Sequence, residues 1–215
     1  MKITFLGTGT SMGVPVAGAF GSHKLGPDPR NLRSRCSLFV QTSEASLLID
    51  AGPEFREQSL RCGVREIDAV LITHEHMDHV SGLDDLRPFT ISRPSPIPLY
   101  SHSRVLDSIR RRFDYMFGPN RYPGSTSVTL RAVDQPFHIG TVRIVPLPVT
   151  HGDLSIYGYR IGDMAYMTDV QAIPESTMEL LDGVKLLVMG ALRWSVPHPS
   201  HMTIEAAVSS AEKVG

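Results

Sequence analysis

Four side chains that can bind metal ions lie within six residues of this sequence: His74, His76, Asp78 and His79. They follow Ile67–Ile72, a mostly apolar run that predicts a buried strand, and a loop after such a strand can be rigid while its side chains stay free. Imidazole nitrogens and carboxylate oxygens bind divalent ions such as zinc or manganese. Three imidazoles and a carboxylate so close together are rarely needed for packing a protein core. The spacing predicts that His74 and His76 face one ion and that Asp78 and His79 turn toward a second.

The pattern His-x-His-x-Asp-His after an apolar strand resembles the signature of the metallo-β-lactamase superfamily. Three further residues, Asp50, His151 and Asp169, match other motifs of that superfamily in the same order along the chain. The resemblance implies that Asp50 orients the ligands without binding metal. It implies that His151 is the remaining ligand of the first metal and that Asp169 bridges two metals. The expected fold is α/β (α+β), the metallo-β-lactamase fold, a four-layer αββα sandwich.

Within the superfamily, the chain is most similar to the branch that contains the phosphoribosyl cyclic phosphodiesterase of phosphonate breakdown. In that branch the histidine matching His201 lies beside the metals, contacts the substrate phosphate and can act as an acid toward the leaving oxygen. We therefore expect His201 to be catalytic and to bind substrate, and Asp78 to be both a ligand and catalytic. His198 is a candidate substrate contact, although a surface residue is the simpler interpretation. The matching stretches are Gly7–Ser11, Gly13–Pro15, Leu83–Pro88, Pro146–Val149 and Pro199–His201.

The expected cofactors are two divalent metal ions, zinc or manganese. Two such ions about 3.5–4 Å apart can share a water and lower its pKa toward neutrality. The implied activity is hydrolysis of a small, linear or cyclic phosphate diester by a hydroxide that bridges the metals. The resemblance assigns His74, His76 and His151 to the first ion, Asp78 and His79 to the second, and Asp169 to both.

Proteins with several other functions carry the same motif. A ribonuclease Z-like nuclease carries it but usually adds a flexible arm that grips tRNA, and no insertion rich in glycine and basic residues is visible here. Thioester and lactone hydrolases of the superfamily also carry it. A metal-binding protein without turnover is the alternative from another class.

The sequence departs from the related phosphodiesterase in two places. The related enzymes have a further strand after the last helix, ending in a histidine of the second metal site, and this sequence ends at Gly215. We expect either a shortened chain or a second site that lacks one ligand. The related enzyme also binds a structural zinc through a cysteine cluster near Gly18–Ser22. No cysteine occurs in that stretch, so no structural zinc is expected.

The elements that must position these residues alternate along the chain. Short apolar segments bounded by Gly, Ser and Asn predict strands. The last segment, Thr203–Val214, has apolar residues at helical spacing and predicts an amphipathic helix with Gly215 as its cap. The strands are expected at Ile3–Leu6, Cys36–Gln41, Ser46–Asp50, Ile67–Ile72, Ile97–Tyr100, Ser127–Val133, Val142–Pro146, Ile156–Ile161, Met164–Thr168 and Lys185–Met189. The other helical segments are expected at Pro53–Leu60, Gly82–Phe89, Ser103–Phe113 and Pro174–Leu181.

Length and composition bound the remaining possibilities. A chain of 215 residues fits one domain, residues 1–215. With 21 Lys and Arg against 22 Asp and Glu, and no long basic run, nucleic acid is not a favoured partner. A small molecule is the expected partner, and a homodimer is left open. There is no signal-peptide core or membrane-spanning run, which favours a cytoplasmic protein. Cys36 and Cys62 are expected to be free thiols.

Overall fold

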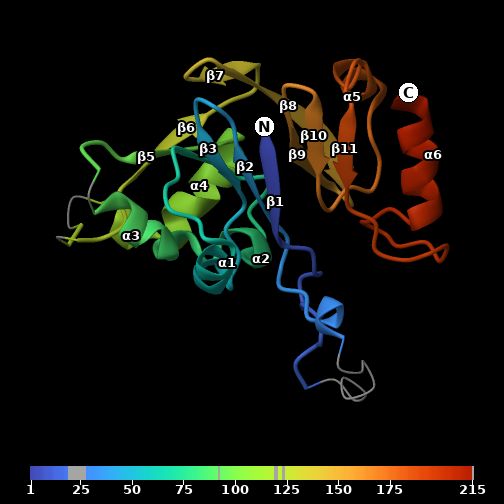
Figure 1. Cartoon of the computed structure of the whole chain (residues 1–215). Helices are drawn as coiled ribbons and strands as arrows, with labels where there is room; N and C mark the ends of the chain where they lie inside the picture. The colour runs from blue at the N-terminus through green and yellow to red at the C-terminus, as the bar shows by residue number, and fades with distance from the viewer. Residues whose placement is uncertain (19–27, 92, 119–120, 123, 215) are drawn as a thin grey trace. The chain divides into compact units, whose positions relative to one another are not determined.

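The computed structural model describes residues 1–18, 28–91, 93–118, 121–122 and 124–214 (Figure 1). The chain divides into two compact units, Met1–Arg131 and Ala132–Gly215. Residues 19–22 of the stretch matched to a structural zinc site, and the predicted cap at Gly215, lie outside the described residues. Among the described residues, no helix is long and apolar enough to cross a membrane.

The amino-terminal unit is built on a six-stranded sheet in the order β1-β2-β3-β4-β5-β6. Strands β1, β2 and β3 are antiparallel, and β4 and β5 continue the sheet in parallel with β3. β3 and β4 are buried along their whole length, which explains their continuous apolar sequences. The strands are β1 (Lys2–Gly7), β2 (Ser37–Gln41), β3 (Ser46–Ile49), β4 (Ala69–Leu71), β5 (Ile97–Ser101) and β6 (Val128–Ala132).

Helices of the amino-terminal unit pack on a core that holds Leu6, Phe55, Ile72 and Leu83, all fully buried. The predicted helix at Pro53–Leu60 is observed at Phe55–Cys62, where Gly63 ends it with a left-handed φ of 67°. The helices are α1 (Phe55–Cys62), α2 (Met77–Val80), α3 (Arg87–Thr90) and α4 (Ser103–Arg112), with 3-10 turns at Pro29–Asn31, Leu83–Leu86 and Asp114–Met116.

The carboxy-terminal unit contains a five-stranded sheet in the order β11-β10-β9-β8-β7. Its β8 runs to His151 and is longer than predicted, because the sequence favoured an end at Pro146. Pro146 and Pro148 fit inside β8 because its other neighbour, β7, pairs only with Val142–Ile144. On the β7 side, proline's lack of an N–H therefore costs no strand hydrogen bond beyond Ile144. The strands are β7 (Phe137–Ile139), β8 (Val142–His151), β9 (Leu154–Ile161), β10 (Met164–Met167) and β11 (Leu186–Met189).

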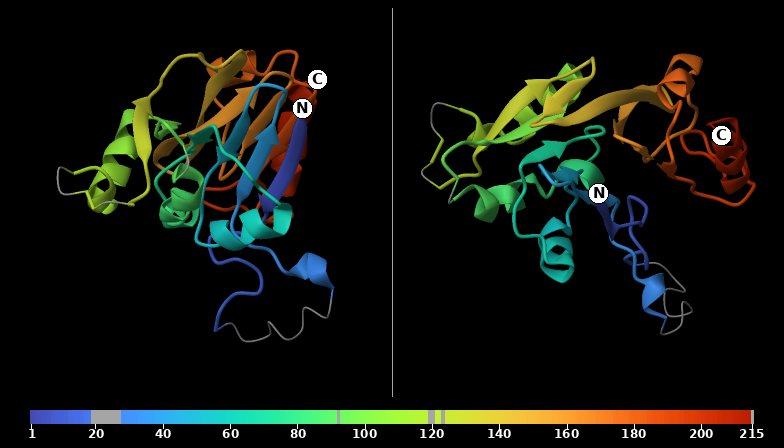
Figure 2. Two further views of the ribbon diagram at one scale, coloured as in Figure 1. Left: turned by 60° about the vertical axis from the view of Figure 1, so that its left-hand side comes forward. Right: turned by 45° about the horizontal axis from the view of Figure 1, so that its top comes forward.

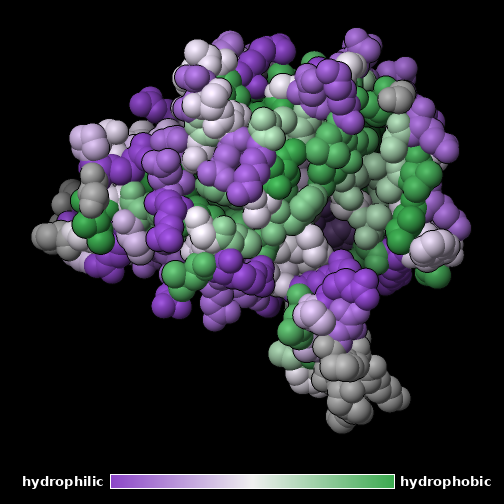
Figure 3. Space-filling view, viewed as in Figure 1, coloured by the Kyte–Doolittle hydropathy of each residue, from purple (hydrophilic) through white to green (hydrophobic). Residues whose placement is uncertain are grey.

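Two helices complete the carboxy-terminal unit, α5 (Glu175–Leu180) and α6 (Ile204–Val214), the latter drawn in red beside this unit's strands in Figures 1 and 2. Only part of the predicted apolar stripe of α6 packs against the core. Ala207 and Val214 pack against the unit's core, whereas Ile204 is 37% and Val208 53% exposed. Figure 3 shows apolar surface where α6 lies. The contact face of α6 is therefore narrower than the helical spacing predicted.

Candidate metal site

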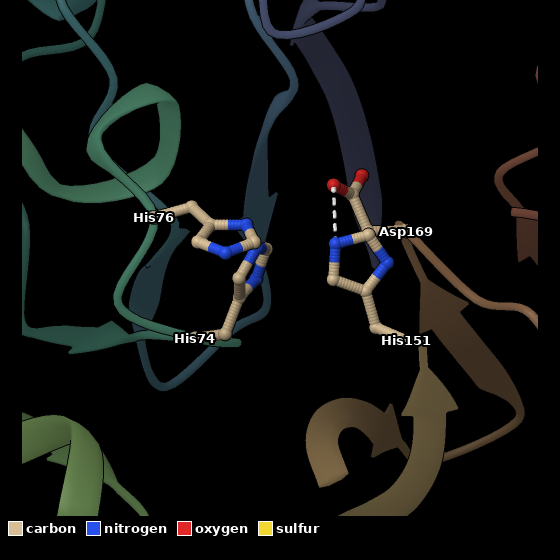
Figure 4. Close-up of side chains that lie close together, drawn as sticks. All are labelled: His74, His76, His151 and Asp169. Carbon is tan, nitrogen blue, oxygen red and sulfur yellow. Dashed lines mark hydrogen bonds and ion pairs between the residues drawn. The ribbon is translucent and has the colours of Figure 1, made fainter. Parts of the chain in front are cut away.

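The histidine loop has two parts with different backbone conformations. After β4 the chain is extended as far as His76, which precedes the first residue of α2 with φ −63° and ψ 147°. α2 then carries Asp78 and His79 on a single helical turn, which the sequence did not predict because four residues show no periodicity. His74 Nε2 lies 2.9 Å from His76 Nδ1, so the two rings turn a nitrogen toward each other (Figure 4). His79 Nε2 lies 3.4 Å from Asp78 Oδ2.

Asp50 lies at the centre of the candidate ligands of the amino-terminal unit. Its side chain is fully buried, and its backbone has a φ of 61°, a conformation uncommon for residues other than glycine. The carboxylate accepts hydrogen bonds from Thr73 N at 2.8 Å, Thr73 Oγ1 at 2.8 Å and His79 Nδ1 at 2.7 Å. Burial raises the pKa of the Asp50 carboxyl above its ordinary value, and the hydrogen bonds from His79 and Thr73 offset only part of that rise.

This network fixes which ring nitrogen of each histidine carries hydrogen. Thr73 Oγ1 donates to Asp50, so it accepts from His74 Nδ1, 3.0 Å away, and His74 keeps a lone pair on Nε2. His79 donates from Nδ1 to Asp50 and keeps a lone pair on Nε2. Metal-binding histidines typically have their other nitrogen held in this way. The residues present therefore fit divalent metal ions.

Two glycines allow the loop to pack closely on the segment that follows β3. A Cβ at Gly52 would collide with the backbone oxygen of Asp78, and one at Gly82 would collide with the backbone oxygen of Gly52. Hydrogen bonds from Ala51 N to His79 O and from Gly82 N to Ala51 O, 2.8 and 2.9 Å long, join the same segments. The backbone after β3 thus holds both Asp50 and α2 in place.

In the carboxy-terminal unit, His151 and Asp169 lie together. His151 ends β8 and donates from Nδ1 to the backbone oxygen of Ser200 over 2.8 Å, which leaves a lone pair on Nε2. That Nε2 lies 3.9 Å from Asp169 Oδ2 (Figure 4). Asp169 has a φ of 53°, and its other carboxylate oxygen accepts from Thr168 Oγ1 at 2.9 Å. Asp50 and Asp169 are the two described residues other than glycine with positive φ, and both belong to predicted motifs.

The loop before α6 brings His198 and His201 to the same place. The ring of His201 lies 4.8 Å from that of His151 and 5.0 Å from that of His198, measured between centroids. His198 Nδ1 also accepts from Ser200 N at 3.3 Å. The sequence identified both histidines but missed Thr73, Thr168 and the Ser200 carbonyl. Thr73 and Thr168 could have been identified, because each places a hydroxyl directly before a histidine or aspartate of a motif. The Ser200 carbonyl could not, because a backbone contact leaves no pattern in the sequence.

The fold and these histidine and aspartate sets define a hydrolase of the metallo-β-lactamase fold. The chain belongs to the beta-lactamase superfamily, whose domain model matches residues 46–215, and within it to the PhnP family. A crystal structure of a diphosphatase from the PhnP family aligns with a TM-score of 0.90 and 40% identity, covering 99% of this chain and 81% of that chain. The predicted resemblance to the phosphonate-breakdown branch and the predicted fold class are confirmed.

Two curated relatives carry other names. An octanoyltransferase of Porphyromonas gingivalis is 43% identical over 218 residues, which cover 100% of this chain and 44% of that protein. A ribonuclease Z of Bradyrhizobium diazoefficiens is 29% identical over 161 residues, covering 73% of this chain and 48% of that protein. The chain thus spans less than half the length of these two relatives.

Proposed function

We propose that the chain is a metal-dependent phosphodiesterase that hydrolyses a small, linear or cyclic phosphate diester. The observation that carries the proposal is the set of three imidazoles, His74, His79 and His151, each held at one nitrogen and left with a lone pair on the other. Such a set suits borderline divalent ions, for which we propose zinc or manganese. The 40% identity to a diphosphatase of the PhnP family supports phosphoryl chemistry.

We further propose that the two units contribute to shared ions. His74, His76 and His151 would hold one ion, Asp78 and His79 a second, and Asp169 both. The order of the motifs along the chain supports this assignment, since it is the order found in the superfamily. The chemistry of the donors supports it too, because His74 and His76 alone are too few for a zinc site, where protein ligands typically number three or four.

When bound, two divalent ions would lower the pKa of a water molecule and neutralise charge on the phosphoryl oxygens. In the hydrolysis, the water gives up one proton to solvent and its oxygen bonds to phosphorus, the bond from phosphorus to the leaving oxygen breaks, and that leaving oxygen gains a proton. We propose that His201 supplies this proton as an imidazolium and contacts the phosphoryl oxygens. His198, with its ring 5.0 Å from that of His201, would contact the same substrate group.

A second candidate substrate is a small diphosphate, which the name of the PhnP-family relative favours. Cleaving a phosphoanhydride needs the same water and the same charge neutralisation, but the leaving group is a phosphate that needs less help from an acid. The role of His201 therefore separates the two candidates. For a diester with a poor leaving group, loss of His201 should cost far more than for a diphosphate.

The test is a comparison of substrates with the metal-loaded chain. Bis(4-nitrophenyl) phosphate, a ribose cyclic phosphate, ADP, an octanoyl thioester and a precursor tRNA are each incubated with chain loaded with Zn²⁺ or Mn²⁺. We expect hydrolysis of the cyclic phosphate, its loss with a chelator and its return on adding metal. Turnover of ADP alone would replace the diester by the diphosphate. Turnover of the thioester or the tRNA alone would overturn both phosphate proposals.

A further inference from the structure

Helix α4 contacts the histidine loop at Glu75, which lies between His74 and His76. Arg104, near the start of α4, forms an ion pair with Glu75 Oε1. Arg112, the last residue of α4, donates from its guanidinium to the backbone oxygen of Glu75. The two arginines therefore hold the side chain and the main chain of the same residue.

Several features indicate that these contacts restrain the loop. The Glu75 side chain is only 15% exposed, and its second carboxylate oxygen is buried without a hydrogen-bond partner. A partly buried carboxylate destabilises the fold unless a cation pairs with it, and Arg104 is that cation. Arg112 Nη1 also lies 3.6 Å from Met77 Sδ, so its guanidinium contacts the residues on both sides of His76. The three consecutive arginines Arg110–Arg112 are exposed, yet Arg112 also contacts the loop.

His76 has the greatest need of such a restraint. It is exposed, and it stands where the extended backbone passes into the four-residue helix α2. His74 and His79 are buried and held through Thr73 and Asp50. A ligand pair binds metal tightly when its geometry is set before the ion arrives, because little ordering entropy is then lost on binding. Fixing Glu75 fixes the peptide that joins the two ligands.

We infer that Arg104 and Arg112 are positioning residues that raise metal affinity by clamping Glu75, and so set the separation of His74 and His76. This inference rests on the metal binding in the proposed function and on no particular substrate. Electrostatics makes a contrary prediction, because removing a positive charge near a divalent cation should strengthen its binding. A loss of affinity on removing either arginine would therefore indicate positioning.

The test measures Zn²⁺ affinity by competition with a chromophoric chelator, together with the visible d–d spectrum of the Co²⁺-loaded chain. We expect Arg104→Met and Arg112→Met each to weaken Zn²⁺ binding by about 10-fold, the lower end of the usual effect for groups that support metal ligands. Their Co²⁺ spectra should change as well. Arg104→Lys and Arg112→Lys should recover most of the affinity. Arg111→Met is the matched control, since Arg111 lies in the same exposed turn of α4, and it should bind like the parent chain.

Equal or tighter Zn²⁺ binding by both methionine variants would overturn the inference. If Arg112→Met does not fold, the Zn²⁺ affinity of Arg104→Met tests the inference alone. Arg104 suits this because its side chain is 39% exposed and reaches Glu75 from the surface. Failure of the parent chain to bind Zn²⁺ would overturn the proposed function and this inference together. Parent binding with unchanged variants would overturn the inference alone.

Discussion

In the amino-terminal unit the candidate ligands belong to one hydrogen-bonded network that starts at the fully buried Asp50 and passes through Thr73 to His74. In the carboxy-terminal unit His151 is instead held by the backbone oxygen of Ser200, in a loop whose neighbour His198 is only partly buried. A buried hydrogen-bond network whose members are all satisfied holds its side chains rigidly. We therefore expect the candidate ligands of the first unit to be the more rigid set, and the loop of the second unit to be the part that varies with substrate.

The largest effect should follow from removing a ligand of the rigid unit. For His76→Ala we expect hydrolysis to fall to the uncatalysed background and metal content to drop, because a ligand with no replacement is lost. His138→Ala is the control, since His138 is an exposed histidine on β7. Phosphodiester hydrolysis and metal analysis of the purified variants check this. Retained metal and retained rate would remove His76 from the site.

The second-largest effect is expected for His201, in the loop before α6 of the carboxy-terminal unit. We expect His201→Ala to keep its full metal content but to lose about 10²–10⁴-fold in kcat, the usual contribution of a general acid. The loss should be largest for diesters with poor leaving groups. Steady-state kinetics with a series of leaving groups, alongside metal analysis, measures this. Full activity in the variant would exclude His201 from catalysis.

Asp50→Asn tests the centre of the buried network. Asparagine tolerates the left-handed backbone at this position, so the fold should persist. Its amide cannot accept from Thr73 N, Thr73 Oγ1 and His79 together as a carboxylate does, so we expect metal affinity to fall by about 10–100-fold. Chelator competition measures the affinity, with Asp134→Asn as the exposed control. An unchanged affinity would show that Asp50 does not orient His79.

The smallest effect is expected at Thr73, whose hydroxyl links Asp50 to His74. Thr73→Val keeps the shape of the side chain and leaves the Asp50 contact to the backbone N–H of residue 73. We expect metal affinity to fall by about 10-fold, because the hydroxyl's hydrogen bonds to Asp50 and from His74 are both lost, and Thr73→Ser to restore it because serine supplies the same hydroxyl. If serine failed to restore the affinity, packing of the methyl group would be the cause.

The sequence predicted the first unit's site from residues alone, because its four candidate ligands lie within six positions and the geometry is local. The second unit's residues, His151, Asp169 and His201, stand far apart in the sequence and could be identified only through resemblance to a family. Local detail escaped prediction in both units. Four residues are too few to show helical periodicity, so α2 was missed, and β8 continues through two prolines that usually end a strand. Contacts to backbone atoms, such as His151 with Ser200, leave no pattern in the sequence.

We propose, as the central feature of this protein, that His76 and His151 bind the same ion. The most direct test counts bound metal equivalents in His76→Ala, His151→Ala and the double variant, each folded and loaded with Zn²⁺ under identical conditions. If the residues share an ion, the double variant loses no more metal than either single variant, because the same equivalent is already gone. If the two losses add to two separate equivalents, the residues bind different ions and the claim is wrong.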